Sequence, residues 1–348
     1  MKKKMTLAEI AKLAGVNSST VSRVLHEDPK AKISDSVRKK VLHICDKYNY
    51  RPSATARAVA SGLTYRIGLI LGALEQDFSS PVFALFTRGL CNTLQKNNYT
   101  LSILWAEQPD ATIDRHLTDF LMSDIADGYV LGSNMLRSGI SDKIQDMKRP
   151  LAYLADNISY YPEGFCGVYG TSQNACQQIW QMIPPEYYGK ILYVCGTNND
   201  TKFTDVTTAA KSLQISPDVI RHHNLKERNC GFPFDRNNAI QWAESHLDLL
   251  RQQKLIWCGA DLTALGIADV LRKNGMIPGR DVGLIGYDNI ENMNMYHEEP
   301  FLTTIDPHQE EMGQQIAMLL LQIISGKKAD VKKIAVEAEL IIRQSYRN

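Results

Sequence analysis

The sequence predicts an α/β protein in which a small all-helical N-terminal headpiece precedes a larger body with parallel sheets. Helix, glycine turn and second helix follow one another in the first 50 residues, whereas the chain from Arg66 onward alternates short apolar segments with amphipathic ones. Charge separates the same two parts. Residues 1–64 hold 13 Lys and Arg against 5 Asp and Glu, a net charge of +8, and the remainder has a net charge of −7. A basic end on an acidic body is typical of a chain that binds a polyanion at that end.

The first helix is predicted to begin at Thr6. Thr6 and Glu9 have the spacing of a capping box, in which each side chain bonds the backbone amide of the other residue. Gly15 ends this helix, because glycine accepts the left-handed backbone of a tight turn. The residues expected on its buried face are Leu7, Ile10, Ala11 and Ala14.

A second helix, Ser18–Leu25, is predicted to follow the N-cap residue Asn17. Its inward positions are Val21, Val24 and Leu25, and its outward positions are Ser18, Ser19, Ser22 and Arg23. Short polar groups and one long cation suit base edges and phosphates, so the pattern indicates a helix-turn-helix. Ser34 is expected to cap a third helix with a buried stripe of Val37, Val41, Ile44, Cys45 and Tyr48.

An alanine-rich segment follows the headpiece. Pro52 ends the third helix, and Ser53 can cap a short helix, Ala54–Ser61, that stops near Gly62. Such a short helix is marginal by itself, so the residues leave open a flexible interdomain linker. The expected organisation is a headpiece at 1–51, a hinge helix and linker at 52–64, and a body at 65–348.

The body alternates apolar strands with helical stretches such as Val82–Lys96 and Leu262–Asn274. The predicted strands are Ile67–Gly72, Thr100–Trp105, Gly128–Leu131, Leu151–Leu154, Lys190–Cys195, Leu255–Cys258 and Val282–Gly286. This alternation predicts parallel sheets covered by helices on both faces, with ligands at the carboxyl ends of the strands.

The run from Thr6 to Leu25, TLAEIAKLAGVNSSTVSRVL, closely resembles the headpiece of the lac repressor family of bacterial regulators. The run from Tyr50 to Ala58, YRPSATARA, resembles that family's hinge. The resemblance implies that Ser18, Ser19 and Arg23 read bases and that Thr20, Ser22 and Arg57 contact phosphates. It also implies that paired hinge helices insert an apolar wedge in the minor groove, at Val59 here, where leucine is usual.

The body resembles the family's two-lobed, periplasmic-binding-protein-like domain. The segments that carry the resemblance include 126–131, 260–266, 281–289 and 301–307, while 155–240 match poorly. Family topology implies three crossings between the lobes, near residues 157, 289 and 322. The resemblance also places Phe83, Asp261, Asp288 and Gln309 at an effector cleft.

Two of these effector residues have alternative interpretations. Phe83 can equally be a core residue of its helix, and Asp261 can be the N-cap of the helix that follows it. Sugar-binding members often have an arginine in the segment 202–207, where an ungapped alignment places Asp205. Carbohydrate is therefore only a family-level expectation for the ligand.

No catalytic motif is found, and no metal or cofactor is expected. The adjacent pair His222 and His223 rarely faces one ion, and a solvated loop is its expected context. The seven scattered cysteines, the absence of a secretory signal and the absence of a long apolar run indicate a cytoplasmic protein with no membrane contact.

The sequence therefore predicts a homodimeric, sequence-specific transcription regulator, usually a repressor in this family, rather than an enzyme. Its expected partners are a near-palindromic DNA operator, a second copy of the chain and a small-molecule effector. The alternatives are a cytosolic solute-binding protein and an α/β enzyme without DNA binding. The missing signal peptide and the basic headpiece argue against the solute-binding protein. Salt-dependent affinity for an operator distinguishes the regulator from the enzyme.

Overall fold

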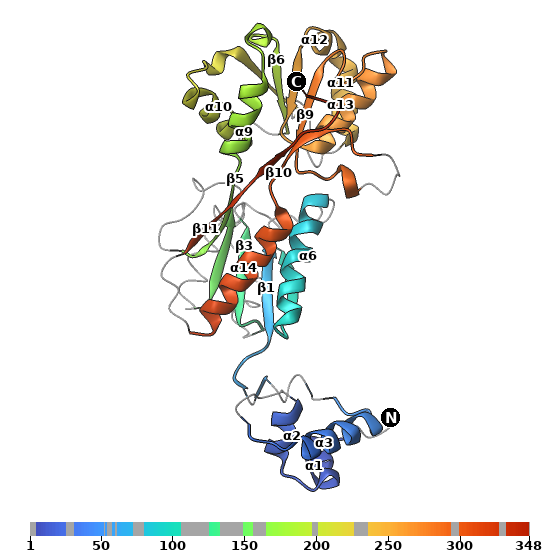
Figure 1. Ribbon diagram of the computed structural model, residues 1–348, viewed down its shortest axis with the longest axis vertical. Coiled ribbons are helices and arrows are strands. Elements are labelled where there is room, and N and C mark those ends of the chain that lie inside the picture. Colours follow the sequence, from blue (N-terminus) through green and yellow to red (C-terminus); the bar gives the residue numbers. More distant parts are fainter. Residues whose placement is uncertain are drawn as a thin grey trace. The chain divides into compact units, whose positions relative to one another are not determined.

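The computed structural model describes residues 5–25, 31–51, 53, 58–59, 61–71, 80–105, 125–132, 149–155, 165–196, 201–225, 236–293, 299–326 and 332–347. The chain divides into two compact units, Met1–Tyr65 and Arg66–Asn348, shown in Figure 1. The first unit is the headpiece with the hinge segment, and the second is the body.

The headpiece packs three helices, α1 (Leu7–Ala14), α2 (Ser18–Leu25) and α3 (Asp35–Lys47), around one small core. The predicted capping box is confirmed: the amide of Thr6 donates to Glu9 Oε2 at 2.7 Å, and the amide of Glu9 donates to Thr6 Oγ1 at 3.2 Å. Gly15 ends α1 with a left-handed φ of 68°. The buried core residues are Ile10, Ala11, Ala14, Val21, Val24, Val41, Cys45 and Tyr50.

One residue of the predicted stripe on α3 is corrected by the structure. Tyr48 is 42% exposed and lies after the last residue of α3, where it serves as the C-cap. The chain reverses at Asn49, whose φ is 47°, and Tyr50 then enters the core instead. The 3.6-residue periodicity fails here because the helix has already ended.

The hinge segment is described only in part. Ala58 and Val59 are helical, Val59 is 82% exposed, and the amide of Gly62 donates to the carbonyl of Ala58 at 2.8 Å. Gly62 has a φ of 71°, as expected for a residue that ends a helix. Residues 54–57 and 60, Arg57 among them, lie outside the described part.

The body contains two six-stranded sheets. The first sheet has the order β11-β5-β4-β3-β1-β2 and is parallel throughout, while the second has the order β12-β10-β9-β8-β6-β7 and is parallel except at β12. We call the lobe around the first sheet the N-terminal lobe and the other the C-terminal lobe. The strands of the first sheet are β1 (Arg66–Leu71), β2 (Thr100–Trp105), β3 (Gly128–Gly132), β4 (Leu151–Ala155), β5 (Gly167–Thr171) and β11 (Lys333–Glu337). Those of the second are β6 (Ile191–Cys195), β7 (Ile220–Asn224), β8 (Leu255–Cys258), β9 (Gly283–Tyr287), β10 (Thr303–Asp306) and β12 (Glu339–Ile341).

Helices cover both sheets. In the N-terminal lobe, α6 (Pro81–Lys96) and α14 (Gln309–Ile324) lie side by side, and α14 contacts β3, β4 and β5 (Figure 1). In the C-terminal lobe, α9 (Gln173–Met182) and α10 (Thr201–Ser212) cover one face, and α11 (Arg236–Ser245), α12 (Leu247–Arg251) and α13 (Asp261–Lys273) cover the other. Short 3₁₀ turns occupy Pro185–Tyr187, Pro217–Val219 and Glu291–Met293. The described helices include none long and apolar enough to cross a membrane.

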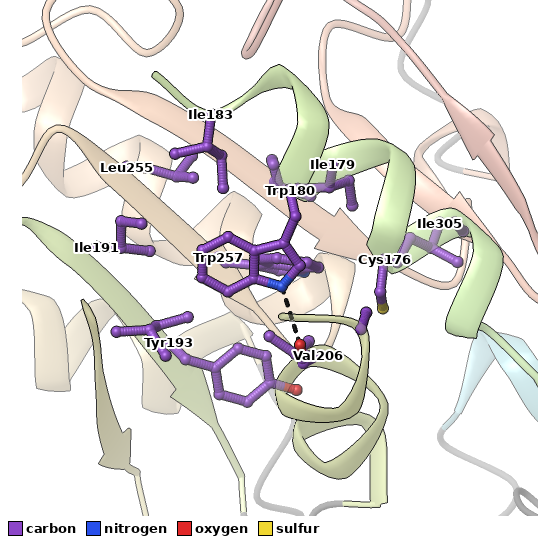
Figure 2. Close-up of a cluster of buried hydrophobic side chains, with 14 of the residues drawn as sticks. Cys176, Ile179, Trp180, Ile183, Ile191, Tyr193, Val206, Leu255, Trp257 and Ile305 are labelled. Carbon is purple, nitrogen blue, oxygen red and sulfur yellow. Dashed lines mark hydrogen bonds between the residues drawn. The ribbon is translucent and has the colours of Figure 1, made fainter. Parts of the chain in front are cut away.

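Two tryptophans centre the core between α9, α10 and the second sheet (Figure 2). The rings of Trp180 on α9 and Trp257 on β8 lie 6.0 Å apart, and both side chains are almost fully buried. Trp180 Nε1 donates to the carbonyl of Val206 on α10 at 2.9 Å, which satisfies the indole and links the two helices. This core holds α10 against the strands whose ends form the site described below.

All seven predicted strands are present, each within one residue at either end, and the fold class is confirmed. The predicted lobe crossings are wrong. The chain crosses at Ser172, between β5 and α9; at Pro307, between β10 and α14; and at Ala338, between β11 and β12. Each true crossing follows a strand that the sequence pattern missed: β5, β10 or β11. Position 157 lies outside the described residues, between two strands of the first sheet.

Candidate functional site

The outward face of α2 begins at its cap. Asn17 Oδ1 accepts from the amide of Thr20 at 2.8 Å, from Thr20 Oγ1 at 2.7 Å and from Ser19 Oγ at 2.7 Å. One side chain therefore satisfies the helix end and orients two of the hydroxyls predicted to meet DNA. Ser19 and Arg23 are exposed, and Ser18, Thr20 and Ser22 are half-buried.

The opposite face of α2 holds the helix in place. Val21 and Val24 on that face are buried against the other two helices. The polar face of α2 is thereby fixed, and a helix of this width fits the major groove. Val59, the residue predicted to form the wedge, has an exposed apolar side chain and is not part of the headpiece core. Arg57 lies outside the described residues.

A cavity of about 410 Å³ opens between the two lobes of the body. α6 of the N-terminal lobe contributes Leu85 and Arg88, and the segment after β9 contributes residues of the C-terminal lobe. The segment of the second crossing, from β10 into α14, forms the rest. The lining residues are Leu85, Arg88, Asp288, Asn289, Met293, Asp306, His308, Gln309, Glu310 and Glu311. Its volume suits a small organic molecule.

Three residues that line the cavity have unusual backbone conformations. Asp288, Asn289 and His308 have φ values of 114°, 53° and 54°. A non-glycine residue at positive φ costs free energy, and such residues cluster at ligand sites, where the surrounding structure holds them. Here the surrounding bonds are visible: the amide of Asp288 donates to the carbonyl of Ile305 at 2.8 Å, and the amide of His308 donates to Asp306 Oδ1 at 2.8 Å.

Asp306 and Asn289 connect the cavity wall to the segment that follows β12. Asn289 Nδ2 donates to Asp306 Oδ2 at 2.8 Å, and Asn289 Oδ1 accepts from Arg343 Nη2 at 2.7 Å. Arg343 follows β12, the last strand. Arg88 on α6 pairs with Glu310 on α14 at the same opening. The wall therefore contains one polar group around Asp306 and Asn289 and a separate ion pair between Arg88 and Glu310.

Asp288 lies at the cavity and is 7% exposed. Its Oδ1 accepts from Lys202 Nζ on α10 at 3.1 Å. The same ammonium donates to the carbonyl of Gly259 at 2.8 Å and lies 3.9 Å from the centre of the Tyr287 ring. Burial is the main cause that raises the pKa of Tyr287 far above its usual range, so this ring is neutral.

Asp261 lies in the interior of the C-terminal lobe and is not among the residues that line the cavity. Oδ1 accepts from Thr304 Oγ1 at 2.6 Å and Oδ2 accepts from the amide of Ile290 at 2.8 Å. Gly286 lies so close to Oδ1 that any Cβ there would collide with it. The carboxyl joins β9, β10 and the segment after β9. It is the first residue of α13, and Ala260, not Asp261, is the N-cap.

Of the other residues predicted from the sequence, some line the cavity and some do not. Gln309, the first residue of α14, lines the cavity. Phe83 is half-buried in the first turn of α6 and is absent from the lining residues. Asp205, which the ungapped alignment placed at the family's arginine, accepts from Ser172 Oγ at 2.7 Å. The cation that reaches the site from α10 is Lys202, one turn earlier.

The histidine pair is not in a loop as predicted. His222 and His223 lie on the edge strand β7, where Cys195 Sγ is 3.0 Å from His222 Nε2 and the Phe203 ring stacks on His222 at 4.3 Å. Among the described residues no group of three or more His, Cys, Asp or Glu side chains could hold a metal ion.

Comparison with known proteins assigns both units. Residues 6–53 match the family model described as bacterial regulatory proteins of the lacI family, and residues 189–346 match a periplasmic binding protein-like domain. The transcriptional regulator RegA of Clostridium acetobutylicum is 25% identical over 98% of both chains. The chain therefore carries a DNA-binding domain of the lacI type followed by a periplasmic binding protein-like domain. With the same two parts as its relatives, it is a DNA-binding transcription regulator rather than an enzyme.

Solved structures share the fold of this chain. The lac repressor dimer bound to operator and an anti-inducer has a TM-score of 0.73 at 18% identity, with 99% of each chain covered. The complex of the regulator CelR with cellobiose has a TM-score of 0.65 at 19% identity, covering 99% of this chain and 100% of the other. The predicted two-lobed architecture is therefore that of the family.

Proposed function

We propose that this lacI-family regulator is a homodimeric repressor whose affinity for a near-palindromic operator is set by a small effector bound between the lobes. The cavity carries this proposal. It is lined by both lobes and by the second crossing, so a ligand there favours one arrangement of the lobes over another. A regulator of this kind acts on the chromosome, and we therefore place it in the cytoplasm.

The effector is proposed to be hydroxyl-rich. Asp288 and Gln309 offer an acceptor carboxylate and an amide, and Leu85 of α6 offers apolar surface. Phe83, in the first turn of the same helix, is proposed to contact the effector although it is not among the residues that line the cavity. The CelR–cellobiose complex supports a sugar-like molecule, since it shares the fold. Asp261 then acts indirectly, by holding the strand ends on which Asp288 stands.

DNA recognition is proposed to reside on α2 and the hinge. Ser18, Ser19 and Arg23 read base edges, Thr20, Ser22 and Arg57 contact phosphates, and Val59 wedges into the minor groove. The exposure of Ser19, Arg23 and Val59 supports this assignment. A solute-binding protein or an enzyme would show no specific affinity for a selected DNA site. The affinity of a DNA-binding regulator for such a site should instead fall steeply as the salt concentration rises.

Replacing Arg23 with Ala tests the assignment. If Arg23 makes a bidentate base contact, its loss weakens operator binding by about 1–3 kcal/mol and relaxes the base preference at one position of each half-site. The measurements are fluorescence anisotropy and selection of binding sites from random DNA, with Arg251→Ala on the body as the control. Unchanged affinity and unchanged preference in Arg23→Ala would refute the base contact.

A further inference from the structure

The ammonium of Lys202 occupies a corner that has the chemistry of a cation site. A carboxylate oxygen of Asp288, the carbonyl of Gly259 and the face of Tyr287 surround it at 3.1, 2.8 and 3.9 Å. These are three different kinds of contact that an ammonium favours: a charged acceptor, a neutral acceptor and an aromatic face. Gly259 and Asp288 directly follow the strands β8 and β9, so the corner lies at the carboxyl ends of neighbouring strands.

The corner is built by the fold and does not depend on Lys202 for its shape. Tyr287 and Asp288 are 8% and 7% exposed, and Asp288 is held at a φ of 114° by its own backbone bond to Ile305. Lys202, in contrast, reaches in from α10 and its side chain is 23% exposed. The receptor groups are rigid and buried, whereas the cation comes on a flexible stem that water can reach.

The cavity beside this corner carries an excess of carboxylates. Its described lining includes four of them, Asp288, Asp306, Glu310 and Glu311, against a single lysine or arginine, Arg88, which pairs with Glu310. Lys202 supplies a second positive charge from outside the lining, through Asp288. An anionic ligand would meet repulsion here, and a cationic ligand would be attracted.

We propose that the corner formed by Asp288, Gly259 and Tyr287 is an ammonium-binding site, that Lys202 is its internal occupant, and that the effector carries an amine which displaces Lys202. This inference rests on the proposed effector cavity and names the chemical class that it selects, an amine-bearing and hydroxyl-rich molecule. Two ammonium groups cannot share one buried carboxylate without repulsion, so an amine that enters from the cavity competes with Lys202 for Asp288.

Displacement of Lys202 would affect the first crossing, because the start of α10 is bonded to it. Lys202 is the second residue of α10, and Asp205 lies three residues later. Asp205 accepts from the amide and the hydroxyl of Ser172, at the first crossing, at 3.4 and 2.7 Å. The amide of Ala338, at the third crossing, donates to the carbonyl of Thr171 beside it at 2.8 Å. Movement at the start of α10 therefore reaches two of the three segments that join the lobes.

Chemical rescue tests the site without knowledge of the natural effector. Lys202→Ala removes three carbons and the ammonium, which n-propylammonium chloride can replace. We expect propylammonium to raise the melting temperature of Lys202→Ala by about 2–4 °C and to leave the wild type nearly unchanged. The probe controls are 1-propanol, which has the same length without charge, and sodium chloride at equal ionic strength.

Three protein controls make the result specific. Lys202→Ala with Asp288→Asn lacks the carboxylate and should lose the rescue. Asp288→Asn by itself shows how far this substitution lowers the melting temperature. Lys211→Ala removes an exposed lysine from the same helix and should behave as the wild type. Equal shifts in wild type and Lys202→Ala, rescue by 1-propanol, or rescue that persists in the double variant would each overturn the ammonium site.

The same proteins separate this inference from the function it rests on. Operator affinity of Lys202→Ala is measured with and without propylammonium by fluorescence anisotropy at constant ionic strength. Rescue of the melting temperature with a severalfold change in operator affinity supports both proposals. Rescue with no change in operator affinity keeps the ammonium site and overturns its role as the effector site.

Discussion

Asp261 and Asp288 follow neighbouring strands, but their surroundings differ. Asp288 lies at the cavity and faces Lys202, whereas Asp261 is fully buried and bonds only groups of its own lobe in the described contacts. Burial and, second, the nearby charge of Asp288 raise the pKa of Asp261 to about 8, although bonds from Thr304 and Ile290 act in the opposite direction. At neutral pH this carboxyl therefore holds its proton in the folded chain.

This raised pKa predicts a pH dependence of stability. In the unfolded chain the carboxyl ionises near pH 4, and in the folded chain near pH 8, so between these values the folded state binds one proton more. Stability then falls as pH rises through that window, and it levels off above the folded pKa. Asp261→Asn keeps the acceptor for Ile290 and a polar group for Thr304 but cannot ionise. We expect its stability relative to wild type to increase from pH 5 to pH 8.

Urea denaturation at pH 5 and pH 8 measures this difference. Asp248→Asn is the control, because Asp248 has an exposed side chain and pairs only loosely with Arg251 on its own helix. Asp261→Ala should be destabilised at both pH values, by about 1–3 kcal/mol, because it leaves the Ile290 amide without its acceptor. A difference between wild type and Asp261→Asn that does not change with pH would contradict the raised pKa.

The sequence identified only some of the residues of the candidate site. Asp288 and Gln309 could be proposed because they follow a strand and begin a helix next to segments that resemble the family. Lys202 could not be identified, since its contacts with Gly259, Tyr287 and Asp288 join residues more than 50 positions apart. Asn289 and His308 line the cavity with left-handed backbone conformations that the residue pattern does not predict, and Asp306 lines it from the end of β10, a strand that the pattern missed.

The helices α6 and α14 meet through two glycines. A Cβ on Gly89 of α6 would collide with the carbonyl of Glu310, and a Cβ on Gly313 of α14 would collide with the carbonyl of Phe86. The reciprocal arrangement brings the two helix backbones together, much closer than side chains would allow. Because α14 begins at the second crossing and α6 carries Arg88 and Leu85, this contact sets one wall of the cavity.

Gly313→Ala should therefore be destabilising although alanine is the better helix former. Overpacking of this kind typically costs about 1–3 kcal/mol, since one backbone must shift away from the other. Gln314→Ala is a matched control on the next residue of the same helix, where the side chain is exposed, and should change stability by less than about 0.5 kcal/mol. Equal unfolding free energies for the two variants in urea would show that the helices separate without cost.

Strands with long apolar runs could be predicted from the sequence, the edge strand β2 among them, and strands with weaker apolar patterns could not. The strands predicted correctly have nearly continuous apolar runs because both faces of their sheets are covered, as in Ile191–Cys195. The missed strands carry weaker patterns: β5 reads GVYGT, β7 reads IRHHN and β11 has alternate exposed residues. These strands lie at or near sheet edges, where solvent relaxes the need for apolar residues.

For the whole molecule, the charge difference between the two parts defines where DNA can bind. The net charge of +8 in residues 1–64 attracts the phosphate backbone, and the net charge of −7 in the remainder repels it. The cavity proposed for the effector lies in the acidic body, so on this proposal effector and operator do not compete for one surface. We expect any effect of one on the other to act through the arrangement of the lobes and to be reciprocal in free energy.

The last prediction concerns the number of headpieces that bind together. α2 has eight residues and presents one short polar face, so one headpiece can read only one half-site. In a dimer, binding of the first headpiece makes binding of the second headpiece intramolecular. A full near-palindrome should therefore bind on the order of 100-fold more tightly than a half-site.

Sedimentation at micromolar concentration should show a dimer. Inserting about five base pairs between the half-sites turns one of them to the opposite face of the duplex, and we expect this to remove the advantage. A monomer that binds an isolated half-site as tightly as the full operator would contradict the dimer and the hinge pairing that depends on it.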